Sequence, residues 1–178
     1  EEVINKVINP TEATGKMRFT WLSNAPWANS GYGQQTRMFV PRLAKLGYDM
    51  AVIAYFGLEG DMINFDGYPC YAKRFHPYGN DICVAHSQSF RADAMISLMD
   101  TWVMEPENYP FGFRWIAWYP VDHDTMPLAV RRKIALATKR IAMSKHGVKA
   151  THDAGLDCSY VPHGIDTKEV YYPRDKAE

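Results

Sequence analysis

Asp122, His123 and Asp124 place an imidazole between two carboxylates in the second half of the chain. They come just after residues 113–119, an apolar run that predicts a strand, with Pro120 and Val121 between, and open α/β sheets bind ligands just past the carboxyl ends of their strands. A neighbouring carboxylate orients a histidine ring and selects its tautomer. The pattern therefore predicts a histidine that can hold a sugar hydroxyl or transfer a proton.

Two other roles are open to these residues. A metal site is disfavoured, because no third ligand stands at helical spacing from them. The two aspartates could instead cap the helix expected after Pro127, and this role is compatible with a ligand site.

A second candidate site lies near the amino terminus, where the β-rich residues 17–23 lead through Gly31-Tyr32-Gly33 into a helix expected over residues 34–46. A strand that opens through glycines into a helix offers backbone N–H groups and the positive end of the helix dipole to a phosphate. A plain glycine turn remains the alternative. A nicotinamide-binding domain is disfavoured, because Thr36 replaces the third small residue of the dinucleotide fingerprint and residues 55–57 lack its acidic residue.

The remaining chemistry-bearing residues carry weaker signals. Trp27 and Tyr32 lie in the glycine loop, where their rings could pack on a sugar or a base. Trp102, Trp115 and Trp118 are expected in the core. His146 and His152 are expected to be surface or packing residues, and His76 and His86 carry no partner pattern. Cys70, Cys83 and Cys158 lack any Cys-x-x-Cys spacing, so we expect reduced, mostly buried thiols of a cytoplasmic protein.

Length and charge limit the class of protein. The 178 residues suffice for one domain, and 20 basic against 20 acidic residues give a formal net charge of zero. No basic cluster supports nucleic-acid binding. No apolar run approaches the roughly 18 residues that span a bilayer, and nothing resembles a signal peptide. Because the sequence starts at Glu1-Glu2 without methionine, we expect a processed, engineered or internal fragment.

Strand and helix signals alternate along the chain. They predict an α/β fold, a Rossmann-like doubly wound parallel sheet with helices on both faces. A short polar helix is expected before Pro10, and residues 101–112 are expected to form a loop. Strands are expected at residues 17–23, 50–55, 69–73, 94–100, 113–119, 140–144 and 157–161, and helices at 34–46, 81–91 (capped by Asp81), 127–138 and 145–154 (capped by Ser144).

Three segments of the sequence resemble family 4 (group 1) glycosyltransferases in order and interval: residues 23–36, 120–124 and 161–166, the last being Val161-Pro162-His163-Gly164-Ile165-Asp166 with Tyr172-Pro173 after it. The resemblance implies one half of a GT-B fold. It implies an amino-terminal, acceptor-side domain of a retaining transferase that uses a nucleotide sugar as co-substrate, with no other cofactor and no metal. The domain would span residues 16–166, after an extension over 1–15 and before an interdomain linker that starts at 167–178.

The resemblance also assigns site residues. Asp122 or His123 would lie near the transferred sugar and are the catalytic candidates. The residues expected to bind substrate or the donor diphosphate are Ser30, Gly31, Tyr32, Gly33, Gln34, Asp124 and His163.

The 178 residues lack the family's donor-domain glutamates and the basic residues that neutralise the leaving diphosphate. We therefore expect little or no catalysis without a carboxy-terminal donor-binding domain, and self-association through the exposed cleft is a further expectation. The rival hypothesis is a stand-alone Rossmann-type module that binds a sugar or nucleotide, and a nucleotide-binding oxidoreductase fragment is weaker. The sugar, the nucleotide and the acceptor are not identified by the sequence.

Overall fold

The computed structural model describes residues 15–167 and 171. The helix expected before Pro10 and nearly all of the expected linker at 167–178 lie outside these residues. Among the helices that the structure describes, none has the length and apolar character needed to cross a membrane.

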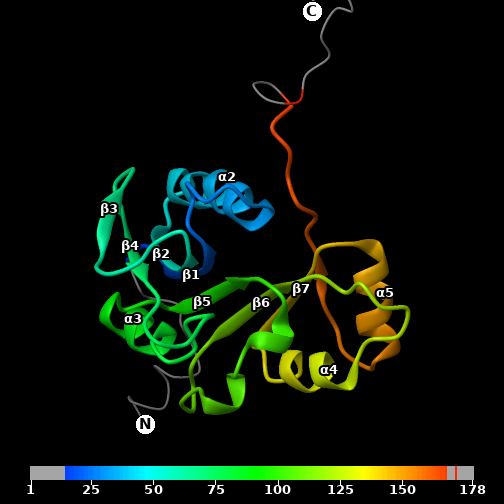
Figure 1. Cartoon of the computed structure of the whole chain (residues 1–178). Coiled ribbons are helices and arrows are strands. Elements are labelled where there is room, and N and C mark those ends of the chain that lie inside the picture. The colour runs from blue at the N-terminus through cyan, green and yellow to red at the C-terminus, as the bar shows by residue number, and fades with distance from the viewer. Residues whose placement is uncertain (1–14, 168–170, 172–178) are drawn as a thin grey trace, which may run out of the picture.

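An eight-stranded sheet, ordered β3-β4-β2-β1-β5-β6-β7-β8, forms the centre of the molecule (Figure 1). All neighbouring strands are parallel except β3 and β4. The strands are β1 (Arg18–Asn24), β2 (Asp49–Phe56), β3 (Ile63–Phe65), β4 (Tyr68–Ala72), β5 (Ala94–Leu98), β6 (Trp115–Tyr119), β7 (Lys139–Ala142) and β8 (Ser159–Tyr160).

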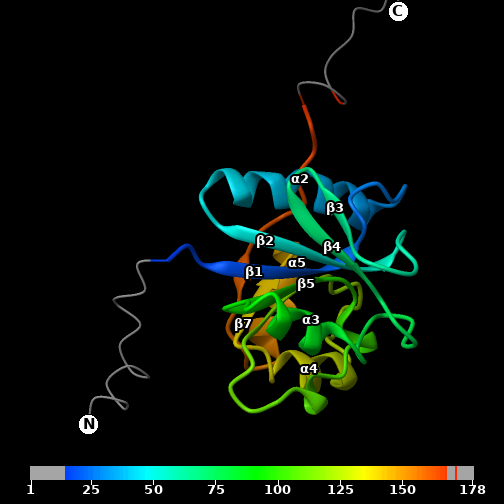
Figure 2. The same ribbon diagram turned by 90° about the vertical axis from the view of Figure 1, so that its left-hand side faces the viewer.

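Helices cover both faces of this sheet, so the doubly wound α/β fold expected from the sequence is confirmed. Helix α2 (Gly31–Lys45) lies on one face, and α3 (Cys83–Ser89) and α4 (Leu128–Ile134) lie on the other (Figure 2). Helix α5 (Lys145–Asp153) adds Ala150 to the core on the α3 and α4 side. Adjacent residues of a strand point to opposite faces, and Trp21 accordingly packs under α2 while Leu22 packs on the other side.

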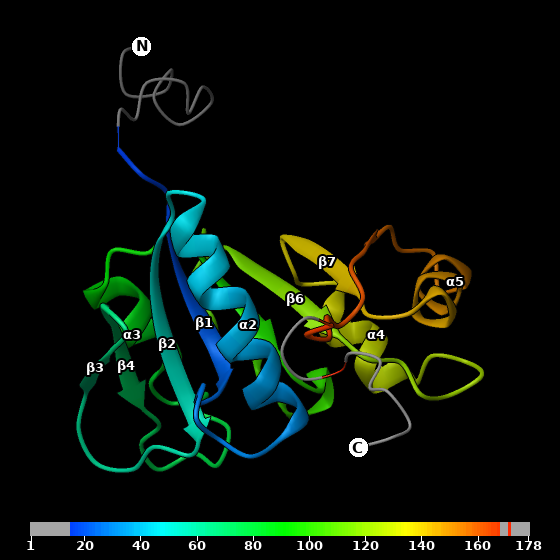
Figure 3. The same cartoon turned by 90° about the horizontal axis from the view of Figure 1, so that it is seen from above.

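Helix α2 begins three residues earlier than expected, so both glycines belong to its first turn. Ser30 is the N-cap, and its Oγ accepts a hydrogen bond from the Gly33 N–H at 3.0 Å. The Asn24 side chain donates to the same Oγ at 2.7 Å, which ties the cap to the end of β1. Seen from above, the helix lies along β1 and β2, and it runs through Pro41 to Lys45 (Figure 3).

Other element boundaries also differ from the expectation. Asp81 does not cap α3: its carboxylate accepts from the Phe75 N–H at 2.9 Å, and α3 starts two residues later, at Cys83, without a side-chain cap. Residues 101–112 contain two short 3₁₀ segments, η1 (Thr101–Val103) and η2 (Pro106–Asn108). Helix α4 is shorter than expected, whereas the cap of α5 is confirmed by a hydrogen bond from the Gly147 N–H to Ser144 Oγ at 2.9 Å.

The order of the strands fixes where a ligand site can form. The chain moves from β1 to β2 on one side and returns to β5 on the other, so the topology reverses between β1 and β5. Side chains on the loops after β1, β5 and β6 therefore gather at one edge, where sheets of this type bind ligands.

Candidate functional site

The amino-terminal end of α2 faces this edge with two unused backbone donors. Among the described residues, no acceptor bonds the N–H groups of Gly31 and Tyr32, whereas the Gly33 N–H is occupied by its cap. A Cβ on Gly31 would meet nothing within 4 Å, but a Cβ on Gly33 would lie 2.3 Å from the Ala28 carbonyl oxygen. The expectation of two equivalent phosphate-binding glycines is therefore revised: Gly33 is needed for backbone packing, and the open donors belong to Gly31 and Tyr32.

Tyr32 joins α2 to the end of β5. Its hydroxyl donates a hydrogen bond to Asp100 Oδ2 at 3.3 Å. Burial raises the pKa of Tyr32 well above its usual range, and the charges of Asp100 and Asp122 raise it further, so the hydroxyl keeps its proton. Asp100 was not among the expected site residues, although a carboxylate directly after a buried strand was the signal that could have identified it.

Asp122 and His123 form an ion-pair-like contact just past β6. The Asp122 Oδ1 lies 2.7 Å from His123 Nδ1, which donates to it, so in the neutral ring Nε2 is the free acceptor. Both side chains are open to solvent, with 83% of Asp122 and 64% of His123 exposed. His146 holds the loop in place by bonding the His123 carbonyl oxygen at 2.8 Å.

The helix-capping role of the aspartates is wrong. Pro127 occupies the N-cap of α4, and no side chain bonds the first turn. Asp124 lines a separate hollow with Arg131 and Asp153.

His163, near the end of the described residues, lies at the same edge of the sheet. Its ring packs edge-on against Tyr32 and Trp118, with ring centroids 6.1 and 5.5 Å away. Burial lowers the pKa of His163, which favours the neutral ring. The next residue is held from both sides: Gln35 Nε2 donates to the Gly164 carbonyl and Gln35 Oε1 accepts the Gly164 N–H, each at 2.9 Å.

A cavity of about 290 Å³ lies beside these groups. Asp100, Thr101 and Trp102 after β5 form part of its wall, and Asp122 and His123 after β6 form another part. The edge thus combines backbone donors, carboxylates, a histidine and a hollow large enough for a small molecule.

The other expected residues lie elsewhere. Gln34 lines a second hollow of about 440 Å³ with Arg37, between α2 and residues 164–166. Trp27 is turned away from the site, because its indole donates to the Gly57 carbonyl oxygen at 2.6 Å and its ring packs on Phe65. Trp102 is 60% exposed and was wrongly expected in the core, whereas Trp115 and Trp118 are buried as expected.

The remaining histidines and the cysteines do not extend the site. His86 stacks on Tyr71, and Cys70 and Cys83 are buried while Cys158 is half-buried. Within residues 15–167 and 171, no group of three His, Cys, Asp or Glu side chains is placed to hold a metal ion.

Neither a scan of protein-family models nor a search of curated proteins finds a match to the chain.

Proposed function

We propose that this chain is the acceptor-side domain of a retaining, nucleotide-sugar-dependent glycosyltransferase of the GT-B type. In this proposal the catalytic cleft is completed by a donor-binding domain, which supplies the nucleotide site. The sheet edge described above forms the wall of the cleft that holds the acceptor and contacts the transferred sugar.

The observation that carries the proposal is the meeting of the three segments that resemble these transferases. The segment at 23–36 touches the one at 161–166 through Tyr32 with His163 and through Gln35 with Gly164. The segment at 120–124 reaches the same edge through Asp122 and His123, which line one cavity with Asp100, the residue that accepts a hydrogen bond from the Tyr32 hydroxyl. Three segments that are distant in the sequence all resemble these transferases and lie side by side in the structure. A shared ligand site is a physical reason for such a pattern.

The groups at this edge suit glycosyl transfer. The N–H groups of Gly31 and Tyr32, at the positive end of α2, can bind an oxygen of the donor diphosphate. His123, oriented by Asp122, presents Nε2 to a sugar hydroxyl. Charge that develops on a leaving diphosphate needs further cationic donors, which the proposal assigns to the second domain.

A transfer assay tests the proposal. The chain alone is expected to transfer no sugar from a panel of nucleotide sugars, and addition of the donor-binding domain, in the same chain or separately, is expected to give turnover. Robust transfer by the chain alone would contradict the division of labour proposed here. Failure to obtain turnover in any combination would contradict the transferase itself.

A binding module without chemistry is the second candidate. It is favoured by one observation, that the cavity between Asp100 and His123 is formed entirely by this chain. Saturable binding of a sugar by the chain, together with absence of transfer in every combination, would support it.

A further inference from the structure

We propose that the acceptor is a neutral saccharide, and that one of its rings enters the cavity beside Asp100 with Trp102 as its stacking platform. The inference rests on the proposed function and deepens it by naming the acceptor class. Three features of the cavity carry it: an exposed aromatic ring, a lining with two carboxylates and no lysine or arginine among the described residues, and an unpartnered buried hydroxyl.

Trp102 is the aromatic element of the cavity. It lies in η1 and lines the hollow, and 60% of it is exposed, so its ring is accessible to a ligand. Tyr78 meets it edge-on at 6.4 Å, and Tyr55 continues the aromatic row towards β2. The apolar face of a sugar ring packs well on such a surface, because an aromatic ring buries large area with little loss of conformational freedom.

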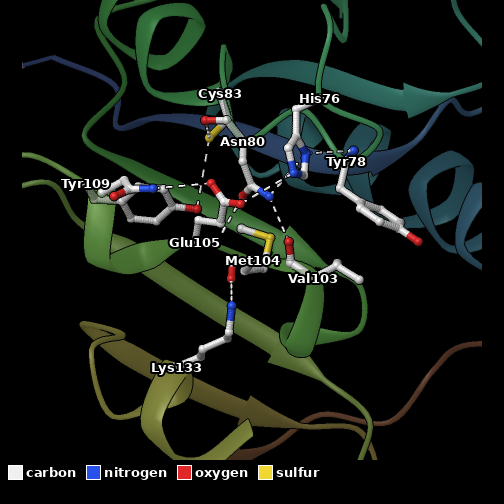
Figure 4. A network of polar contacts seen from close by, with 10 residues as sticks. His76, Tyr78, Asn80, Cys83, Val103, Met104, Glu105, Tyr109 and Lys133 are labelled. Atoms are coloured by element: carbon white, nitrogen blue, oxygen red, sulfur yellow. Dashed lines mark hydrogen bonds and ion pairs between the residues drawn. The ribbon is translucent and has the colours of Figure 1, made fainter. Parts of the chain in front are cut away.

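The segment that carries Trp102 is held rigidly. Asn80 donates from Nδ2 to the Val103 carbonyl oxygen at 2.7 Å and accepts the Glu105 N–H at 3.2 Å, and Lys133 bonds the Met104 carbonyl oxygen from the opposite side (Figure 4). His76 adds a contact from Nε2 to the Glu105 carboxylate at 3.5 Å. A site held by hydrogen bonds from two sides is already formed before its ligand binds, which lowers the entropic cost of binding.

The charges of the lining select against anionic ligands. Asp100 and Asp122 line the cavity, and among the described residues no lysine or arginine does. A phosphate or a nucleic-acid backbone would be repelled here, whereas carboxylates accept hydrogen bonds from neutral hydroxyl groups. The lining therefore favours a polyhydroxylated ligand without charge.

Thr101 supplies the third feature. It is 2% exposed and lies in the cavity wall, and its Oγ1 has no hydrogen-bond partner among the described residues. Buried hydroxyls are usually paired, so an unpaired one at the wall of a cavity points to a partner that the ligand provides. The volume of about 290 Å³ is at the lower end for small-molecule sites and suits one ring rather than a long chain.

Titration of the chain with neutral methyl glycosides, followed by ¹H–¹⁵N NMR, tests the inference. Assignment of the Trp102 indole signal by W102F allows binding to be followed at the platform itself. We expect saturable shifts of this signal with at least one glycoside, and no comparable shifts with inorganic pyrophosphate or tetramethylammonium. Preferential binding of either charged probe in the Trp102 cavity, or of no glycoside at all, would overturn the inference.

Three variants sharpen the test. W102A and T101V are each expected to weaken glycoside binding about fivefold or more, the size of one lost hydrogen bond or stacking contact, whereas W102F retains most of it. The matched control is F111A, which removes an exposed aromatic ring of the same β5–β6 connection that does not line the cavity. Equal weakening by F111A would contradict the platform.

The complete transferase separates this inference from the proposed function. W102A and T101V are expected to raise the KM for a saccharide acceptor and to leave the KM for the donor unchanged. Transfer that proceeds to a non-saccharide acceptor and is indifferent to both variants would overturn the acceptor class while the transferase stands. Glycoside binding without any transfer would overturn the transferase while the saccharide site stands.

Discussion

At the scale of single residues, the two glycines that open α2 have different tasks. Gly33 sits against the Ala28 and Ala25 carbonyl oxygens, so only hydrogen fits there, whereas Gly31 faces open space. The spacing Gly-x-Gly suggested one shared function, because the sequence does not reveal which glycine faces backbone. The structure assigns packing to Gly33 and leaves the approach of a ligand to Gly31 and Tyr32.

Gly33→Ala is expected to lower the free energy of unfolding by about 3 kcal/mol, since the new methyl group would overlap a backbone oxygen that cannot move cheaply. Gly31→Ala is its matched control and is expected to be neutral or to stabilise by about 0.5–1 kcal/mol, because alanine restricts the unfolded chain. Urea unfolding of both variants measures the difference. Equal stability of the two variants would contradict the packing role of Gly33.

His163 gives a prediction on pH. Burial lowers its pKa in the folded protein below the unfolded value of about 6.5. The unfolded chain then binds more protons as the pH falls below about 6.5, so this contribution to stability is complete above that pH and is lost on acidification. Unfolding by urea at pH 7.5 and 5.5 should show a smaller acid-induced loss in His163→Gln than in the original chain, with the exposed His152→Gln as control. An acid-induced loss of stability in His163→Gln identical to that of the original chain would contradict a lowered pKa of His163.

At the scale of elements, most of the sheet could be predicted because its strands are apolar runs bounded by polar turns. The hairpin of β3 and β4 was only half predicted, since Ile63–Phe65 is short and exposed. Its signal was Asp66-Gly67, a pair with positive φ at both residues (48° and 87°), as a tight hairpin turn requires. The start of α2 was placed late because the glycines suggested a turn, whereas the Ser30 cap overrides their low helix propensity.

Contacts between elements were beyond the sequence. Gln35 and Gly164 are far apart in the chain. Their residue types do not indicate that the Gln35 side chain bonds both the N–H and the carbonyl oxygen of Gly164. The same holds for Asn80, whose amide fixes the segment that carries Trp102. Such contacts depend on the relative placement of loops, which local pattern does not encode. For this reason Asp122 and His123 could be proposed from spacing, while Asp100 and Trp102 emerged as site residues from the fold.

Gln35→Ala is expected to release the segment around Gly164 from α2, because it removes both hydrogen bonds that hold this glycine. Hydrogen exchange of the Gly164 amide should accelerate at least about tenfold, since its protecting acceptor is lost. Gln34→Ala, at the neighbouring position, keeps the pair and serves as the control. Unchanged protection of Gly164 in Gln35→Ala would show that other contacts hold the segment.

At the scale of the whole molecule, the doubly wound sheet brings residues from distant segments of the chain together at one of its edges. β1 and β5 are adjacent at the reversal of topology, and β6 follows, so Tyr32, Asp100 and His123 come together although each follows a different strand. A second domain placed against this edge would enclose the cavity and exclude water. Electrostatic interactions strengthen in such an enclosed site, which is why the proposed transfer is expected only when a donor-binding domain completes the cleft.

In that complete transferase, His123→Ala is expected to lower kcat about 10- to 100-fold, with a smaller change in the KM for the donor, because the contact to the sugar hydroxyl would strengthen as charge develops during transfer. Asp122→Asn should give part of this loss, since the amide no longer holds the Nδ1 proton as a carboxylate does. Asp124→Asn is the matched control, because Asp124 lines the separate hollow with Arg131. Steady-state kinetics with varied donor measure all three variants. A loss in Asp124→Asn equal to that in His123→Ala would show that the charge of the loop, and not the oriented imidazole, supports the reaction.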